Sequence, residues 1–151
     1  MRVSAKADYA IRAMVELAAA GDGPVKGDRL AQAQQIPIKF LENILTDLRH
    51  SGLIRSQRGS EGGYWLARPA AEITLAQVIR AVDGPLATVR GERSEDLAYN
   101  GAAEPLRDVW VAVRASLRHV LEAVTLADVA RGELPASVEA LARDPDAWAP
   151  H

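Results

Sequence analysis

The residues with the most distinctive chemistry are cations and hydrogen-bonding side chains in two short stretches, 39–49 and 58–60. Lysine and arginine bind phosphates, and arginine also enters narrow minor grooves. Asparagine can pair with adenine, and glutamate can accept a hydrogen bond from the cytosine amine. These residue types favour recognition of a nucleic acid. The candidates are Lys39, Phe40, Glu42, Asn43, Arg49, Arg58, Gly59 and Ser60.

Each candidate also has a simpler interpretation. The side chains in 39–49 could form an ordinary solvated helix face, which is the interpretation we favour for Asp47, and Phe40 could belong to the core. The stretch 58–60 could be the flexible tip of an ordinary surface hairpin. The elements that carry these residues help to choose between the interpretations.

The Arg58 stretch lies between two segments that predict a β-hairpin. Apolar periodicity stops at Leu48, and Ser51-Gly52 supplies a helix stop. Residues 53–57 then predict a strand, and residues 63–66, which include two aromatic side chains, predict its antiparallel partner. A helix followed by a hairpin with an Arg-Gly tip is the layout of a winged helix-turn-helix. The aromatic pair is expected to pack within the wing.

Three helices are predicted before the hairpin, over residues 5–20, 26–34 and 37–50. Ser4 is expected to cap the first helix, and Pro37 suits the first turn of the third. Gln35 occupies the turn position where glycine is usual, so a left-handed backbone there costs on the order of 1 kcal/mol. Core spacing on the third helix selects Ile38, Leu41, Ile44, Leu45 and Leu48.

The second half of the chain predicts a capped helix, a long connection and a second helical part. Thr74 caps a helix that Gly84 ends, and residues 86–104 form a polar loop of a length that is usually functional or disordered. A long helix from Pro105 to about Val124 carries a coiled-coil-like apolar seam, too large for one small winged domain to cover, which predicts a dimer. The alternative is that the helix folds back on its own domain. The seam residues are Leu106, Val109, Trp110, Val113, Leu117, Val120, Leu121 and Val124.

The expected fold class is mainly α with a small β-wing, a winged helix-turn-helix domain joined to a long dimerisation helix. The predicted divisions are a DNA-binding domain (1–84), a loop (85–104), the dimerisation helix with the C-terminal helices (105–143) and a tail (144–151). Thr125 is expected to cap a short helix within the third division.

Composition and charge narrow the function classes. Hydrophobic residues make up 48% of the 151 positions and charged residues 25%, a balance typical of a soluble globular protein. With no apolar run of about 20 residues and no visible signal peptide, we expect a cytoplasmic protein without a membrane partner. Residues 1–69 hold 10 Lys and Arg against 7 Asp and Glu, whereas residues 70–151 hold 8 against 13. A basic front and an acidic back suit a DNA-reading domain followed by an assembly segment.

Enzymatic chemistry finds little support in the sequence. The chain has no cysteine, which excludes disulfides, thiolate nucleophiles and cysteine-ligated metals. The three histidines, His50, His119 and His151, have no base–nucleophile or metal-ligand spacing. We therefore expect that the protein is not an enzyme and that it has no metal or other cofactor.

Short motifs from the start of the chain to about Ala130 together resemble a known family. They are Met1–Lys6 with Tyr9-Ala10, Phe40–Leu45, Leu48-Arg49 with Gly52–Ile54, Arg58-Gly59 with Gly62–Tyr64, Ile73–Leu75 and Thr125–Val129. These motifs are similar to those of the Rrf2 family of bacterial transcription regulators. The resemblance implies a homodimer on an inverted-repeat operator, with the third helix in the major groove and the wing Arg-Gly in the minor groove. It also implies that Ser4 and Lys6 contact the DNA backbone.

Many Rrf2 members bind an iron–sulfur cluster through cysteines in the loop before the long helix. The loop here has none, and Asp8, which matches a position that completes the cluster in some members, is interpreted as an ordinary carboxylate. The segments 83–85 and 104–110 look more like a cluster-free branch that includes a repressor of cysteine metabolism, which works with an O-acetylserine sulfhydrylase. The resemblance therefore implies a repressor without a cluster, with a possible role in cysteine or sulfur metabolism and either a metabolic-enzyme partner or a small-molecule effector.

Two questions stay open at this stage. The winged domain could be a protein-interaction module that has lost DNA binding, because fold alone does not fix function. The loop 86–104 could form a small-molecule pocket with the seam near Trp110, or it could be a disordered remnant of a lost cluster site. We favour the remnant, because the loop has few apolar residues to wall a pocket.

Overall fold

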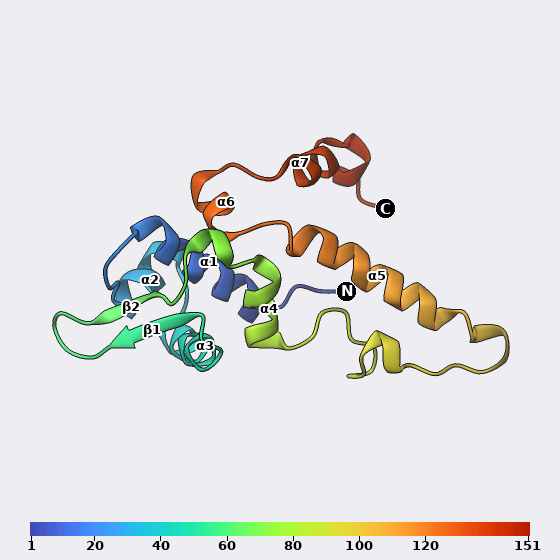
Figure 1. Ribbon diagram of the computed structural model, residues 1–151, viewed down its shortest axis with the longest axis horizontal. Helices are drawn as coiled ribbons and strands as arrows, with labels where there is room; N and C mark the ends of the chain where they lie inside the picture. Colours follow the sequence, from blue (N-terminus) through green and yellow to red (C-terminus); the bar gives the residue numbers. More distant parts are fainter.

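The computed structural model describes residues 1–151 and is mainly helical, with one two-stranded antiparallel sheet (Figure 1). The predicted fold class, mainly α with a small two-stranded wing, is confirmed. None of the helices is long and apolar enough to cross a membrane. The elements are α1 (Ala5–Ala20), α2 (Gly27–Gln34), α3 (Ile38–His50), β1 (Ile54–Gln57), β2 (Gly63–Leu66), α4 (Leu75–Asp83), α5 (Leu106–Leu121), α6 (Leu126–Arg131) and α7 (Ala136–Arg143), with 3-10 turns at 70–72, 94–96, 101–103 and 145–148.

The turn between α2 and α3 has the backbone that the sequence suggested. Gln35 adopts a left-handed conformation, with φ 52° and ψ 47°, and caps the C-terminus of α2. A non-glycine residue pays about 1 kcal/mol for this conformation. The left-handed residue reverses the chain within a short distance, so that α2 and α3 form a helix-turn-helix. Pro37 precedes α3 as its N-cap, one residue earlier than expected.

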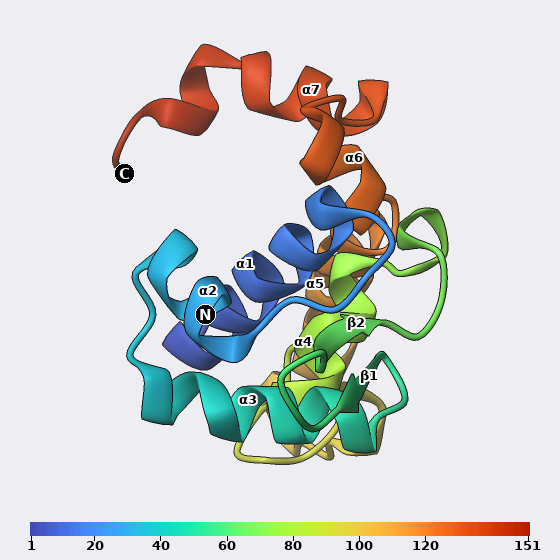
Figure 2. The same ribbon diagram turned by 90° about the vertical axis from the view of Figure 1, so that its left-hand side faces the viewer.

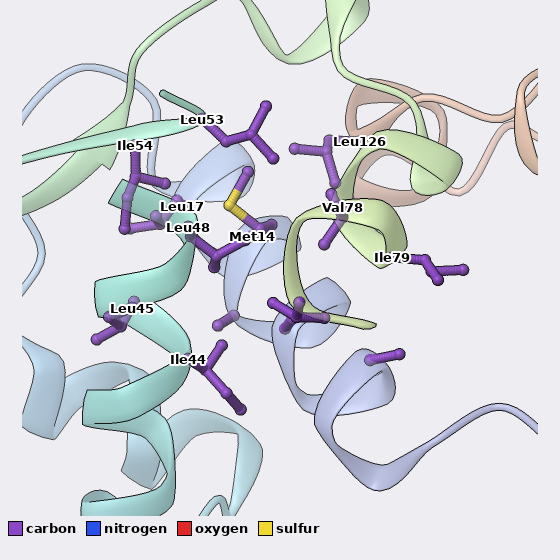
Figure 3. Packing of buried hydrophobic residues seen from close by; sticks show 14 of the residues in the cluster. Met14, Leu17, Ile44, Leu45, Leu48, Leu53, Ile54, Val78, Ile79 and Leu126 are labelled. Atoms are coloured by element: carbon purple, nitrogen blue, oxygen red, sulfur yellow. The ribbon is translucent and has the colours of Figure 1, made fainter. Parts of the chain in front are cut away.

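The core lies between α1, α3 and α4. The apolar stripe of α3 (Leu41, Ile44, Leu45 and Leu48) is at most 1% exposed. Figure 3 shows Leu48 of this stripe beside Met14 of α1. The prediction for Ile38 is wrong: this side chain is 38% exposed, because it belongs to the first turn of α3, ahead of the buried stripe.

The wing is tied to the chain that precedes α2. Strand β1 pairs with β2 in a register that joins Ile54 to Leu66 and Gln57 to Gly63. Beyond β2, Val25 and Tyr64 exchange two backbone hydrogen bonds of 2.9 and 2.8 Å. A Cβ on Gly63 would lie 2.7 Å from the Val25 carbonyl oxygen, and φ there is +147°. Glycine is therefore required for this close approach.

The chain returns to its first domain after α5. Thr74 and Thr125 form a β-bridge, the Leu75 N–H donates to the Val124 carbonyl at 3.0 Å, and the Leu126 N–H donates to the Ile73 carbonyl at 2.9 Å. Leu126 is fully buried in the same cluster as Met14 and Val78 (Figure 3). We use "the head" for α1–α4, the wing and α6. A boundary at residue 84 leaves α6 out of this unit.

Helix α5 differs from the helices of the head, because it contains no buried residue. Figure 1 shows it running away from the head. Figure 2 shows α6 and α7 on the side of α1 opposite α3. The helix ends at Leu121, so the prediction that it continues to residue 124 is corrected. Val124 is 3% exposed and packs in its own chain, where its carbonyl accepts the Leu75 N–H.

The connecting segment (residues 85–104) is folded, which corrects the expectation of a disordered remnant. It contains two 3-10 turns and buries Ser94 and Leu97 to 1% and 2% exposure. The Ser94 hydroxyl donates to the Ala87 carbonyl at 3.0 Å. The Trp110 indole N–H of α5 donates to the Tyr99 hydroxyl at 2.9 Å. Polar contacts and the buried side chains of Leu86 and Leu97 together hold this segment.

Candidate nucleic-acid interface

The exposed side of α3 carries the predicted recognition residues. Because the opposite stripe is buried, all five candidates on this helix lie at the surface: Lys39, Phe40, Glu42, Asn43 and Arg49. The N-terminal half of the second helix of a helix-turn-helix is the part that meets base edges. Thr46, which sequence reasoning missed, lies on the same side one turn further on, and its hydroxyl donates to the Glu42 carbonyl at 3.0 Å. The three- and four-residue spacing from Glu42 and Asn43 could have revealed it.

A groove of about 450 Å³ separates α3 from the wing. Arg49 lines it from α3, Arg58 from the wing and Lys26 from the start of α2. The Lys26 ammonium also donates to the Gly59 carbonyl at the wing tip. Three cations thus surround one groove. Sequence reasoning missed Lys26; its position immediately before a helix N-terminus, where phosphates bind readily, was the available signal.

The wing tip is a tight, exposed turn. Arg58, Gly59 and Ser60 are all exposed, as a contact with DNA requires. A Cβ on Gly62 would lie 2.0 Å from the Gln57 carbonyl oxygen, so only glycine allows the chain to close here. The turn and the contact with Lys26 together fix the direction in which the tip projects from the head.

Ser4 and Lys6 are engaged within the chain. The Ser4 hydroxyl accepts the Ala7 N–H at 2.9 Å as the N-cap of α1 and donates to the Asp83 carboxylate. The Lys6 ammonium lies 2.6 Å from the Asp47 carboxylate of α3. This contact corrects the interpretation of Asp47 as a merely solvated side chain. Surface pairs of this kind contribute about 0–1 kcal/mol, so a phosphate can compete for either partner.

Phe40 combines the two roles that the sequence left open. Its ring meets the Tyr9 ring edge-on, with centroids 5.5 Å apart, and the Arg12 guanidinium lies 4.7 Å from the Tyr9 centroid. The Phe40 side chain is nevertheless 42% exposed. It therefore packs at the margin of the head while part of the ring stays at the surface beside Lys39.

The helix-turn-helix of α2 and α3, followed by the β1–β2 wing, defines a winged helix-turn-helix domain. The sequence matches the Rrf2 family, described as an iron-dependent transcriptional regulator, over residues 3–132. The chain belongs to the Rrf2 family. It is 59% identical to the protein Rv1287 of Mycobacterium tuberculosis, named as an HTH-type transcriptional regulator, over 145 residues that cover 95% of this chain and 90% of that protein.

Two further relatives have solved structures or curated names. The chain is 34% identical to the HTH-type transcriptional regulator CymR of Bacillus subtilis over 131 residues, or 86% of this chain and 90% of that one. The structure of CymR, titled the global cysteine regulator of B. subtilis, matches with a TM-score of 0.74 over 87% of this chain and 98% of that chain at 32% identity. T. potens IscR matches with a TM-score of 0.71 at 33% identity, over 87% and 88%. The protein is a transcriptional regulator of the DNA-binding type, not an enzyme.

Because the family is described as iron-dependent, the residues of this chain are compared with those that hold an iron–sulfur cluster. Iron–sulfur clusters are held mainly by cysteine thiolates, and the chain has none. Asp8 is paired with Arg12 at 3.0 Å, and no group of three or more His, Asp or Glu side chains is arranged to hold a metal ion. The residues of this chain therefore do not fit a cluster. Four arginines lie together where the connecting segment meets α4 and α5: Arg80, Arg93, Arg114 and Arg118.

Proposed function

We propose that the chain is a homodimeric transcriptional repressor that binds an inverted-repeat operator. The observation that carries the proposal is the groove between α3 and the wing, which Thr46 and Arg49 line from α3 and Arg58 lines from the wing. Glu42 and Asn43 are exposed on the same side of α3, one turn before Thr46. In this arrangement α3 enters the major groove, where Asn43 pairs with adenine and Glu42 accepts from cytosine. Arg58 enters the adjacent minor groove, and Lys39, Ser4 and Lys6 contact phosphates.

The exposed apolar side of α5 supports a second copy of the chain as the partner. A helix with an apolar stripe and no buried residue needs a cover, and two identical stripes can cover each other about a two-fold axis. Two heads related by that axis bind two half-sites in opposite orientation, which gives an inverted repeat. A bound dimer represses by occupying the promoter.

A role in cysteine or sulfur metabolism is a finer part of the proposal. It is supported by the likeness to CymR, which is titled a global cysteine regulator. A metabolic enzyme or a small molecule then supplies the signal. The competing candidate, a winged module that binds protein instead of DNA, predicts no salt-dependent DNA binding and no enrichment of an inverted repeat.

The test is a binding selection from fragmented genomic DNA of the source organism at moderate salt. The wild-type chain is compared with Arg58→Ala and with a control, Arg143→Ala, which removes an equal charge from exposed α7. The wild type and the control should enrich the same inverted repeat. Arg58→Ala should lose about 1–3 kcal/mol of operator binding.

Measured affinity should also fall steeply with salt, because phosphate contacts release counterions. Enrichment of single half-sites only would contradict the dimer. Equal operator affinity of the wild type and Arg58→Ala would remove the wing from the proposal. The genes beside the enriched sites would identify the regulated pathway.

A further inference from the structure

A second polar pocket lies where α4, the connecting segment and α5 meet. Its volume is about 470 Å³, within the range of small-molecule sites. Four arginines line it: Arg80 from α4, Arg93 from the connecting segment, and Arg114 and Arg118 from α5. Leu86 is the one hydrophobic side chain in the lining. Such a lining suits a charged ligand rather than an apolar one.

Two carboxylates offset only part of this positive charge. Arg114 pairs with Glu95, and one oxygen of Glu122 accepts from Arg80 at 2.7 Å and from Arg118 at 3.0 Å. The pocket therefore keeps an excess of two positive charges. Hydrogen bonds from Arg80 and, to a smaller extent, from Arg118 hold the pKa of Glu122 below its ordinary value. This carboxylate is therefore ionised at neutral pH and offsets one positive charge.

Arg93 forms no ion pair or side-chain hydrogen bond within the chain, and its charge acts on the Glu95 carboxylate only over a longer distance. No carboxylate lies within 4.0 Å of its guanidinium, and its side chain makes no hydrogen bond, although it lines the pocket. A guanidinium offers five N–H donors in a planar fork that matches carboxylate and phosphate oxygens. The intrachain bonds of the other three arginines use one donor each. Most of the donors around the pocket are thus free for a ligand.

We infer that this pocket binds a small oxyanion with at least two negative charges, of the phosphate or polycarboxylate class, and that the bound anion holds α5 against the head. The second part rests on the proposed dimeric function. The wing lies at the opposite end of the molecule from the connecting segment (Figure 1), which separates this pocket from the operator groove.

The geometry explains how occupancy affects DNA binding. Arg80 belongs to the head, Arg114 and Arg118 belong to α5, and Arg93 belongs to the segment between them. An anion that bonds all three elements restricts the angle at which α5 leaves the head. In a dimer built on α5, that angle sets the separation of the two α3 helices, and operator affinity depends on that separation.

The binding test uses isothermal titration calorimetry. The full-length chain is titrated with inorganic phosphate and with citrate, in Tris buffer at a fixed ionic strength set by sodium chloride. Saturable binding of at least one anion is expected. Arg93→Gln should weaken it by at least about ten-fold, the cost of losing a charge-assisted contact. Arg107→Gln removes the same charge from an exposed α5 position outside this pocket and should leave binding unchanged. No saturable binding, or an equal loss in both variants, overturns the site.

The regulatory part is tested by measuring operator affinity with and without the saturating anion. A change in the wild type that Arg93→Gln abolishes supports the inference. Unchanged affinity with a bound anion overturns the coupling but leaves the site. If Arg93→Gln weakens operator binding without any anion and lowers the salt slope by about one, the pocket is a contact for DNA phosphate, and the small-molecule assignment is wrong. If no operator exists at all, the proposed function fails while the titration still decides on the anion site.

Discussion

The head and α5 differ in how their apolar side chains are covered. In the head, each helix from α1 to α4 turns buried residues toward a shared core, and the short α6 adds Leu126 to it. Helix α5 is as long as α1, with 16 residues, but buries none of them. Val109 keeps 47% of its surface exposed on this helix. The head has a core within one chain, whereas α5 has none, and we expect the proposed dimer to cover it.

This contrast predicts two kinds of destabilisation. A substitution in the head should lower the free energy of unfolding by an amount that does not depend on protein concentration. A substitution on the stripe of α5 should act through association, so its effect should depend on concentration. Four substitutions, in order of decreasing expected effect, test whether the head and α5 differ in this way.

Leu48→Ala should have the largest effect on the head. Leu48 is fully buried on α3, so truncation removes apolar contacts and leaves a cavity that costs about 2–5 kcal/mol. Urea unfolding at two protein concentrations measures the loss, which should be the same at both. Leu141→Ala on α7, where the side chain is 56% exposed, serves as the control and should stay within about 0.5 kcal/mol.

Val109→Asp should have the next largest effect, on association. An ionised carboxylate in the covered stripe costs several kcal/mol, so we expect the dimer dissociation constant to rise by roughly 100-fold. Sedimentation equilibrium measures it. Ala115→Asp is the control, because at 100° per residue Ala115 faces away from the stripe. A monomeric wild type, or equal weakening by both variants, would count against α5 as the dimer contact.

Thr125→Ala tests the junction where the chain leaves the α5 side and re-enters the head. The Thr125 hydroxyl accepts the Asp128 N–H at 3.2 Å, and the Asp128 carboxylate accepts the Thr125 N–H at 2.9 Å, which is a complete capping box. Loss of the hydroxyl should cost about 1 kcal/mol of the free energy of unfolding. Thr125→Ser keeps the hydroxyl and should recover most of that loss in the same urea titration.

Glu122→Gln should have the smallest effect, and one that depends on pH. Because the pKa of Glu122 is lower in the folded chain than its ordinary value of 4.5, the carboxylate stabilises the fold above that value, and this contribution is lost as pH falls through the folded pKa. The difference in the free energy of unfolding between wild type and variant should therefore be largest near pH 7. It should shrink and disappear as the pH falls below about 4.5. A constant difference over that range would show that the charge is not responsible.

The sequence predicted the local elements of the head well, because their signals are local. Ser4, Thr74 and Thr125 cap helices as expected, and each residue could be recognised from its immediate neighbours. The recognition residues also follow from helical spacing, since a buried stripe on α3 leaves the opposite side exposed. Their contacts with DNA stay a prediction.

The features that the sequence could not supply depend on contacts between distant residues. Helical period suggested a buried Ile38 and an α5 seam that reaches Val124, but the first lies outside the core and the second packs in the head. The pairing of Lys6 with Asp47 joins residues 41 positions apart. The pocket is lined by Arg80, Arg93 and Arg114, which come from three different elements. Their spacing in the sequence does not predict that they lie together.

The return of α6 to the head has a consequence for engineering the protein. The bridge between Thr74 and Thr125 means that the DNA-reading unit is discontinuous in sequence, with residues 85–121 inserted into it. A fragment that stops at Gly84 would leave open the space that Leu126 fills. An exchange of the inserted segment between relatives should therefore keep residues 1–84 together with 122–132 and replace only what lies between them. Because the inserted part joins the head at both of its ends, an exchanged segment has to match the head at two connections rather than one.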